Sequence, residues 1–203
     1  MRIGVDFDNT IASYDVAMHR HAMECGLIDS TVPPNKRLIR DAIRALDDGE
    51  SKWRALQVFC YGPGMQEAEP MPGIKEFFVE CKVRRIPVWI VSHKTREANF
   101  GPPNVRLRKA AMAWLEEQGF LESPAFGIER ERVFFAETRQ AKIDRIRALD
   151  LTHFVDDLEE TFLEPSFPPH IARILLSVNS DGCGGGWRRF ASWPDIQRDL
   201  FGG

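Results

Sequence analysis

Three short apolar runs in this chain each stop abruptly at a polar or acidic residue. The first leads into Asp6, the second (86–91) leads into Ser92, and the third (152–155) leads into Asp156. Apolar runs of this length are typical of strands that are buried on both faces of a parallel sheet. Because strand and helix patterns alternate from residue 72 onward, the sequence predicts an α/β, Rossmann-like fold with three layers around a central parallel sheet.

The polar residues that follow these strands are expected to share one pocket. In an open α/β sheet, the ligand-binding crevice lies outside the carboxyl ends of the strands, where residues distant in sequence converge. Lys142 opens a helical pattern with apolar residues at every third position, and its ammonium group is expected to reach over the strand ends. The other side chains assigned to this pocket are Asp6, Asp8, Ser92, Asp156 and Asp157.

The composition favours a small-molecule partner. The 203 residues carry 27 basic and 30 acidic side chains, interspersed, so the net charge of −3 creates no field suited to nucleic acid or a membrane surface. The four cysteines lie far apart, which argues against a disulfide framework or a zinc site. No leader is expected before the first strand, and no apolar stretch reaches the roughly 20 residues of a membrane span. The sequence therefore predicts a cytoplasmic protein.

Residues 14–70 carry helical rather than strand patterns. Three amphipathic stretches end at Gly26, near Gly49 and before 61–64. A set of helices this small seldom has an adequate core of its own, so we expect an all-helical cap that docks as a lid over the pocket. Residues 1–13 and 71–203 would then form the catalytic core, with a further helix expected at 104–118.

The order of the polar motifs resembles that of the haloacid dehalogenase (HAD) superfamily of aspartate-nucleophile phosphohydrolases. The matching pieces are Asp-Phe-Asp-Asn-Thr at 6–10, a serine after the second strand, a lysine on a following helix and an Asp-Asp pair after the next strand. The resemblance covers residues 1–13 and 71–160, and residues 14–70 carry no signature of the family. It implies a HAD-like core with a cap inserted between the first two motifs.

The resemblance also implies a mechanism of phosphate ester hydrolysis. Asp6 would attack phosphorus and form an aspartyl phosphate, as carboxylates do in other covalent phosphoryl transfers. Asp8 would give a proton to the leaving group and then activate the water that hydrolyses the intermediate. Ser92 and Lys142 would hold the phosphoryl oxygens, the first as a compact donor and the second as a point charge.

Electrostatics independently favours a cation in this pocket. Like charges about 4 Å apart repel by on the order of 4 kcal/mol per pair at an effective dielectric constant of 20, so several carboxylates and a phosphate need a metal ion. An all-oxygen site with room for water suits Mg²⁺. The resemblance implies that the Asp6 side chain, the Asp8 backbone carbonyl and Asp156 are direct ligands. Asp157 would act directly or through water.

Three further residues each have two open interpretations. Thr10 either donates to a phosphate oxygen or caps the turn after the first strand. His93 and Lys94 follow Ser92 directly, so either one contacts the substrate phosphate at the pocket mouth, or both lie in a solvated loop.

Alternative functions fit the same motifs. A phosphotransferase or phosphomutase would pass the phosphoryl group to another hydroxyl, and a regulatory protein would bind metal and phosphate without turnover. Dehalogenation is disfavoured, because dehalogenases of the family dispense with the second aspartate and the metal. Phosphonate cleavage would need a cap lysine such as Lys36 or Lys52, and the presence of Asp8 argues against it. The leading prediction is a Mg²⁺-dependent phosphatase for a small-molecule phosphomonoester.

Overall fold

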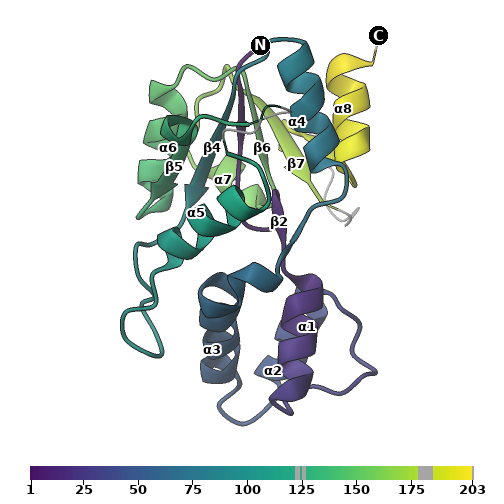
Figure 1. Cartoon of the computed structure of the whole chain (residues 1–203), viewed down its shortest axis with the longest axis vertical. Coiled ribbons are helices and arrows are strands. Elements are labelled where there is room, and N and C mark those ends of the chain that lie inside the picture. Colours follow the sequence, from purple (N-terminus) through teal and green to yellow (C-terminus); the bar gives the residue numbers. More distant parts are fainter. Residues whose placement is uncertain (122–123, 125–126, 178–184, 203) are drawn as a thin grey trace. The chain divides into compact units, whose positions relative to one another are not determined.

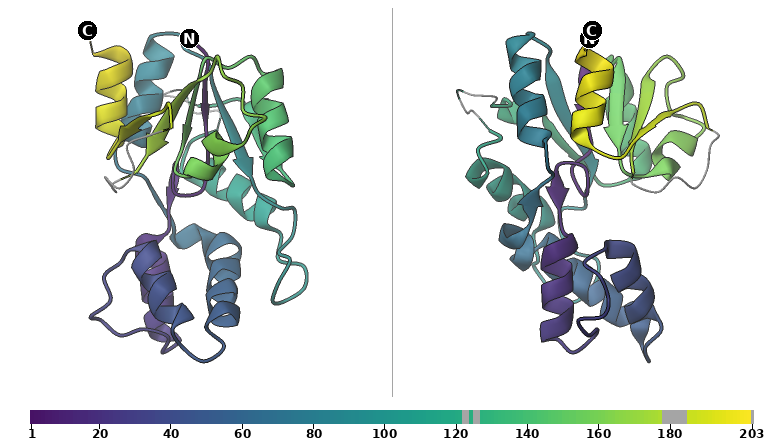
Figure 2. Two further views of the ribbon diagram at one scale, coloured as in Figure 1. Left: turned by 180° about the vertical axis from the view of Figure 1, so that it is seen from behind. Right: turned by 90° about the vertical axis from the view of Figure 1, so that its right-hand side faces the viewer.

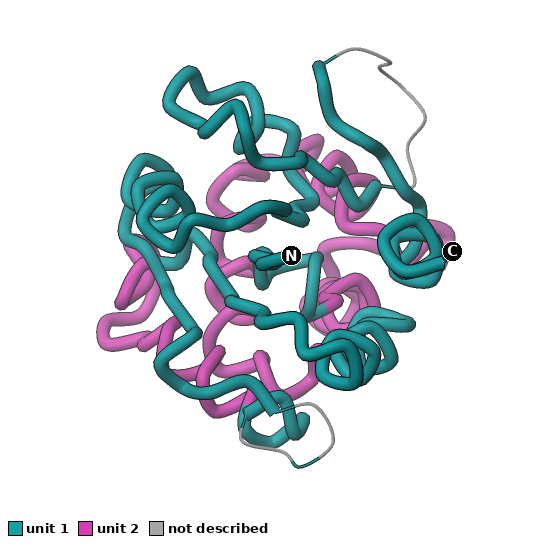
Figure 3. Tube along the Cα trace, turned by 90° about the horizontal axis from the view of Figure 1, so that it is seen from above, with its two compact units in different colours: residues 1–12, 70–94, 116–203 teal, residues 13–69, 95–115 magenta. Residues whose placement is uncertain are grey.

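The computed structural model describes residues 1–121, 124, 127–177 and 185–202, which form two compact units. Unit 1 consists of Met1–Ala12, Pro70–Lys94 and Glu116–Gly203. Unit 2 consists of Ser13–Glu69 and Thr95–Leu115 (Figure 3).

Unit 1 is built on a parallel sheet. Its described residues form six strands in the order β5-β4-β1-β6-β7-β8, and every neighbouring pair is parallel. The strands are β1 (Ile3–Val5), β4 (Val88–His93), β5 (Val133–Ala136), β6 (His153–Asp156), β7 (Ala172–Leu176) and β8 (Arg188–Phe190). The predicted α/β class with a central parallel sheet is confirmed, and the three apolar runs that predicted it are the neighbouring strands β4, β1 and β6.

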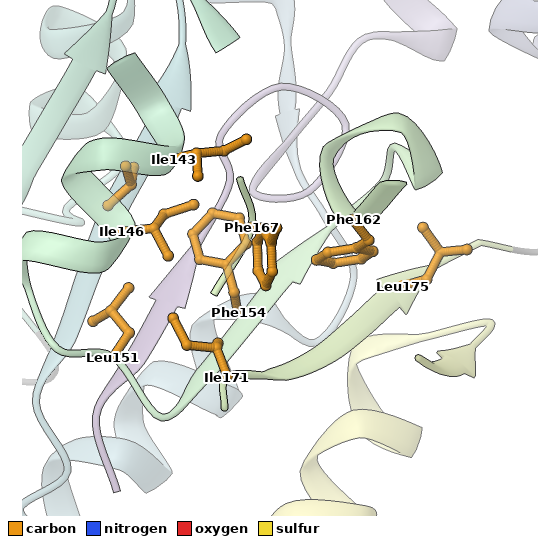
Figure 4. Packing of buried hydrophobic residues seen from close by; sticks show 9 residues of the cluster. Ile143, Ile146, Leu151, Phe154, Phe162, Phe167, Ile171 and Leu175 are labelled. Atoms are coloured by element: carbon orange, nitrogen blue, oxygen red, sulfur yellow. The ribbon is translucent and has the colours of Figure 1, made fainter. Parts of the chain in front are cut away.

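Helices cover both faces of this sheet (Figures 1 and 2). The covering helices are α4 (Ile74–Val83) and α8 (Trp193–Phe201) on one face, and α6 (Arg139–Ala148) and α7 (Glu159–Leu163) on the other. A short 3-10 helix, Arg130–Arg132, leads into β5. Phe77 of α4 packs against Trp193 of α8, with 4.7 Å between ring centroids. Apolar side chains of α6, α7 and the strands beneath them form the cluster in Figure 4.

Gly4 lets this cluster pack directly against β1. A Cβ atom at Gly4 would lie 2.4 Å from Leu151 Cδ1 and 2.6 Å from Phe154 Cδ2, far inside van der Waals contact. A larger residue would therefore push apart the strand and the cluster. Because β1 runs directly into Asp6, this close packing also fixes the position of that carboxylate.

Unit 2 is helical. Its elements are α1 (Asp15–Glu24), α2 (Lys36–Arg44), α3 (Gly49–Tyr61), the 3-10 helix Pro63–Glu67 and most of α5 (Leu107–Glu117). The indole Nε1 of Trp114 on α5 donates to the Ala68 carbonyl oxygen over 2.9 Å, and both residues are buried. Thr95–Leu115, counted in the core by the expected boundaries, thus groups with Ser13–Glu69. The chain passes between the units at four points: within the short paired strands β2 (Ala12–Ser13) and β3 (Glu69–Pro70), after Lys94, and within α5 after Leu115.

Two expected helix boundaries were wrong. Gly49 does not end the second helix, because α2 ends at Arg44 and Gly49 begins α3. Its Cβ would lie 2.4 Å from the Ile43 carbonyl oxygen, so glycine is needed for the close approach of the two helices. The helix expected from residue 104 begins at Leu107, because Asn104 has a left-handed backbone conformation with φ of 66°. Among the described residues, no helix combines the length and apolar character needed to cross a bilayer.

Candidate active site

The end of β1 presents Asp6 and Asp8 on the same side of the chain. The backbone N–H of Asp6 donates to the Val155 carbonyl oxygen over 2.9 Å, which continues the pairing of β1 with β6. Phe7 stands between the two aspartates in sequence, and its side chain is fully buried. Successive side chains of an extended chain point to opposite sides, so the two carboxylates lie on the side away from Phe7. Its carbonyl oxygen accepts bonds from the backbone N–H groups of Ile11 and Ala12, so the chain turns sharply after Asp8.

The strand register brings the other polar residues to the same edge. Val5 pairs with Ile90 on one side and with Val155 on the other. Asp156 follows Val155 directly, and Ser92 lies two residues beyond Ile90. Both are buried, with exposed fractions of 0% and 1%.

Lys142 joins two of these carboxylates. Its ammonium nitrogen lies 2.6 Å from Asp6 Oδ1 and 2.6 Å from Asp156 Oδ2, and its side chain is 3% exposed. The Thr138 hydroxyl accepts a bond from the Ala141 N–H and caps α6, which places Lys142 in the first turn of that helix. The ammonium group of Lys142 therefore lies over the strand ends, as expected.

The charges of Asp6 and Lys142 respond differently to burial. The pKa of Asp6 is raised to about 7, because burial raises it strongly and Asp156 adds to the rise, while Lys142 opposes the shift. Burial would lower the pKa of Lys142, but Asp156 and Asp6 outweigh it and raise this pKa above its usual range. One ammonium group shared by two carboxylates explains both pKa shifts. The positive charge of Lys142 is fully balanced by negative charge, whereas one of the two carboxylate charges is left without a balancing cation. We conclude that the site carries uncompensated negative charge once Asp6 ionises.

The donor atoms at this edge fit a divalent cation. Carboxylate oxygens of Asp6, Asp156 and Asp157 lie within 4.8 Å of one another. One oxygen of Asp156 also accepts a bond from the Leu158 N–H at 3.0 Å, which fixes the orientation of that carboxylate. Hard oxygen donors with excess negative charge are the environment that Mg²⁺ prefers. The side chain of Asp8 is not in this group, and the backbone role that the family resemblance implies for it stays a prediction.

Lys94 forms a second buried ion pair that sequence reasoning did not single out. Its ammonium nitrogen lies 3.0 Å from Asp8 Oδ1 and 2.9 Å from Asp8 Oδ2. The interpretation of this segment as a solvated loop was wrong for Lys94, whose exposed fraction is 4%. Its backbone N–H donates to the Ala136 carbonyl oxygen, so β4 continues in extended form beyond His93. The two-residue spacing from Ser92 was the available signal, because such residues share one side of a strand.

His93 lies on the other side of that strand. Its side chain is exposed, and ring nitrogen Nε2 lies 3.1 Å from the Glu137 carbonyl oxygen. The structure therefore brings Ser92 and Lys94 to the carboxylate side of β4 and directs the His93 ring elsewhere.

Thr10 is fully buried, and its hydroxyl has no hydrogen-bond partner among the described residues. Its carbonyl oxygen accepts a bond from the Trp193 indole over 2.8 Å, which holds the backbone in place. The Thr10 hydroxyl therefore does not cap the turn, and no described residue of unit 1 satisfies its hydrogen-bonding capacity.

We expect Thr10→Val to leave the stability unchanged or to raise the free energy of unfolding by about 1–3 kcal/mol, because valine removes an unsatisfied buried hydroxyl. Urea denaturation would measure the change. Thr138→Val is the matched control and should cost about 1 kcal/mol, since that hydroxyl caps α6. A loss of stability in Thr10→Val similar to that of the control would contradict the unpartnered state of the hydroxyl.

Several solved structures of similar fold are described as hydrolases of the haloacid dehalogenase (HAD) superfamily. A HAD family hydrolase from Deinococcus radiodurans R1, with bound phosphate and sodium, matches with a TM-score of 0.59 and 13% identity over 98% of this chain and 94% of that one. A HAD hydrolase of family IA, variant 3, from Entamoeba histolytica HM-1:IMSS matches with a TM-score of 0.56 and 11% identity over 96% and 94%. A dehalogenase matches with a TM-score of 0.56 and 12% identity over 98% and 96%.

The similarity lies in the structure and not in the overall sequence. No protein-family model matches the chain, and a search of curated proteins gives no match to its sequence. The structural matches extend over nearly the whole length of both partners. The resemblance first seen in the motifs is therefore confirmed at the level of the architecture: the chain has the fold of the haloacid dehalogenase superfamily.

Proposed function

We propose that this protein is a Mg²⁺-dependent phosphatase that hydrolyses a small-molecule phosphomonoester through an aspartyl phosphate on Asp6. The observation that carries the proposal is the placement of Asp6. This carboxylate is 5% exposed, follows the central strand β1, and lies 2.6 Å from the ammonium group of Lys142, with Asp8 two residues further on. A nucleophile, a compensating cation and a second carboxylate are the groups that covalent phosphoryl transfer requires.

Asp6 is the best candidate for the nucleophile. One of its oxygens is bound by Lys142, and the other accepts no hydrogen bond from the described residues. That second oxygen can attack phosphorus, so that an O–P bond forms to Asp6 as the bond to the leaving alcohol breaks. Lys142 lowers the charge repulsion between the carboxylate and the incoming phosphate.

Asp8 supplies the proton chemistry in this proposal. In the first step, its carboxyl group gives a proton to the departing alkoxide. In the second step, the resulting carboxylate takes a proton from the water that attacks phosphorus and releases Asp6. General acid–base catalysis of this kind contributes about 10² to 10⁴ in rate.

The metal would be held by Asp6, Asp156 and Asp157, together with the backbone carbonyl of Asp8 that the resemblance implies. When bound, Mg²⁺ neutralises part of the charge on the carboxylates and on the transferred phosphoryl group. The resident carboxylates position it, and Lys142 holds Asp6 and Asp156 at the spacing observed here.

We favour this activity over dehalogenation, although one structure of similar fold is that of a dehalogenase. Asp8 is present and is held by a buried lysine, which a reaction without acid–base chemistry would not need. Phosphoryl transfer to a second hydroxyl remains the nearest alternative, because it uses the same groups. Incorporation of ¹⁸O from labelled water into the released phosphate would identify hydrolysis.

The purified protein is expected to hydrolyse p-nitrophenyl phosphate in the presence of Mg²⁺ and to lose this activity with a chelator. Mg²⁺ should also raise the melting temperature more at pH 8 than at pH 5, because Asp6, whose pKa is about 7, must ionise to bind it. Activity and thermal denaturation would be measured on the same samples. Phosphate and Mg²⁺ binding without turnover over a broad panel of phosphometabolites would instead favour the regulatory alternative.

A further inference from the structure

The mechanism above assigns no step to Lys94, whose buried ammonium group forms an ion pair with Asp8. We propose that Lys94 is a positioning residue that holds the acid/base carboxylate of Asp8 in the orientation needed for proton transfer. This inference rests on the proposed phosphatase activity, but it concerns a residue to which that activity assigns no role. Its basis is the paired contact of one ammonium group with both oxygens of one carboxylate, at 3.0 and 2.9 Å.

The fold places Lys94 at this point through the strand rather than through a flexible loop. The backbone N–H of Lys94 bonds to the Ala136 carbonyl oxygen of β5 over 2.9 Å, one residue beyond the last residue of β4. The ammonium group then lies 5.4 Å from the centroid of the buried Phe7 ring, within the range of a cation–π contact. The backbone of Lys94 is thus bound to β5 and its ammonium group lies over Phe7, both within unit 1.

The degree of burial distinguishes this pair from an ordinary surface salt bridge. The side chain of Lys94 is 2% exposed, and that of Asp8 is 21% exposed. Exposed ion pairs contribute little to stability and their side chains can change partners, whereas a buried ammonium group must stay paired with a negative charge. Lys94 therefore holds Asp8 persistently, while the exposed fraction of Asp8 leaves surface that can meet a substrate.

Fixing this carboxylate has a direct chemical consequence. Asp8 follows the end of β1 at the start of a sharp turn, where a free side chain would rotate among several staggered conformations. Proton transfer to a leaving group demands a single one of them, with the oxygen within hydrogen-bond distance of the reacting atom. A lysine bound to both oxygens selects one orientation before the substrate arrives.

Binding of the substrate phosphate is the competing role for Lys94. The geometry favours positioning, because each of the two buried lysines serves a different carboxylate. Lys142 contacts Asp6, the proposed nucleophile, and Lys94 contacts Asp8, the proposed acid/base. The two roles predict different kinetic effects, since a phosphate ligand acts on substrate binding and a positioning residue acts on proton transfer.

The test compares Lys94→Met, Asp8→Asn and the double variant with the wild type. The substrates are p-nitrophenyl, phenyl and p-methoxyphenyl phosphate, which share a shape but release phenols of increasing basicity. Rapid-quench measurement of the first turnover isolates release of the phenol. Lys82→Met, an exposed lysine on α4, is the control for loss of one positive charge.

We expect Lys94→Met to slow release of the two more basic phenols about 10-fold or more and release of p-nitrophenol less than about 3-fold, with little change in KM. Asp8→Asn should show the same pattern with a larger effect. The double variant should match Asp8→Asn within about 3-fold, because Lys94 acts only through Asp8.

Two results would overturn the inference. The first is a raised KM and weaker inhibition by inorganic phosphate in Lys94→Met, with no dependence on the leaving group, which would make Lys94 a phosphate ligand. The second is a further large loss of the rate of phenol release when Lys94→Met is added to Asp8→Asn. This comparison does not need the single Lys94 variant, so it is valid even if that variant does not fold. Absence of activity in the wild type would instead refute the proposed function, and the role of Lys94 with it.

Discussion

Asp6→Asn is expected to abolish phosphate ester hydrolysis, with a loss of about 10⁴-fold or more in kcat. The amide has nearly the same shape as the carboxylate but cannot form the bond to phosphorus, so the covalent route is closed. Turnover of p-nitrophenyl phosphate with Mg²⁺ would measure the loss. Activity that survives in a preparation free of wild-type protein would refute the assignment of Asp6 as nucleophile.

The same variant should be more stable than the wild type at alkaline pH when no metal is bound. The pKa of Asp6 rises from 3.8 in the unfolded chain to about 7 in the folded one, so the folded state binds a proton that the unfolded state has lost between these values. Stability therefore falls as pH rises through this window, by at most about 4 kcal/mol in total at about 1.4 kcal/mol per pKa unit. Asparagine removes this penalty while the pair between Lys142 and Asp156 remains.

The measurement is urea denaturation of the metal-free proteins at pH 4 and pH 8. We expect equal stability at pH 4 and a gain of about 1–4 kcal/mol for Asp6→Asn at pH 8. Asp144→Asn, on the exposed surface of α6, is the matched control and should change stability little at either pH. A loss of stability at pH 8 would mean that the charged form of Asp6 is favoured in the fold, contrary to its raised pKa.

The sequence was sufficient for the sheet and for the carboxylates at its edge, because both depend on local patterns. The apolar runs that stop at Asp6, Ser92 and Asp156 predict three of the strands and the residues that follow them, whereas the order of the strands and the short strand β8 come only from the structure. The role of Lys94 depends on where β4 ends. Extended backbone continues past His93 through a bond to the Ala136 carbonyl oxygen. The two-residue spacing of Lys94 from Ser92 is informative only if the strand is known to continue that far.

The misplaced boundaries in unit 2 have a similar cause. Glycine at position 49 predicts a nearby helix end, since glycine is common where helices end. In the structure it instead allows the start of α3 to approach the end of α2, with its Cβ position 2.4 Å from the Ile43 carbonyl oxygen. Residues 95–115 follow β4 directly in sequence, and their grouping with unit 2 arises from contacts such as that of Trp114 with Ala68. Contacts between segments far apart in sequence leave no local signal.

Lys142→Met should be the most destabilising single substitution at the site. It leaves Asp6 and Asp156 buried together without their shared cation, and removal of one member of a buried ion pair costs about 3–5 kcal/mol. The penalty should be largest at pH 8. It should shrink toward pH 5, because Asp6 then carries a proton and the repulsion between the two carboxylates ends. Lys142 lowers the pKa of Asp6, so its loss favours this protonation.

Two further variants separate this charge effect from loss of packing in α6. Arg139→Met removes a partly exposed cation from the same helix, and its loss should cost no more than about 1 kcal/mol at either pH. Adding Asp6→Asn to Lys142→Met should restore much of the lost stability at pH 8, since only one buried carboxylate is then uncompensated. Urea denaturation at pH 5 and pH 8 measures all three proteins. An equal loss of stability at both pH values, with no recovery in the double variant, would show that Lys142 stabilises the fold through its methylene chain and not through its charge. That result would also remove the electrostatic basis for a cation-assisted nucleophile at Asp6.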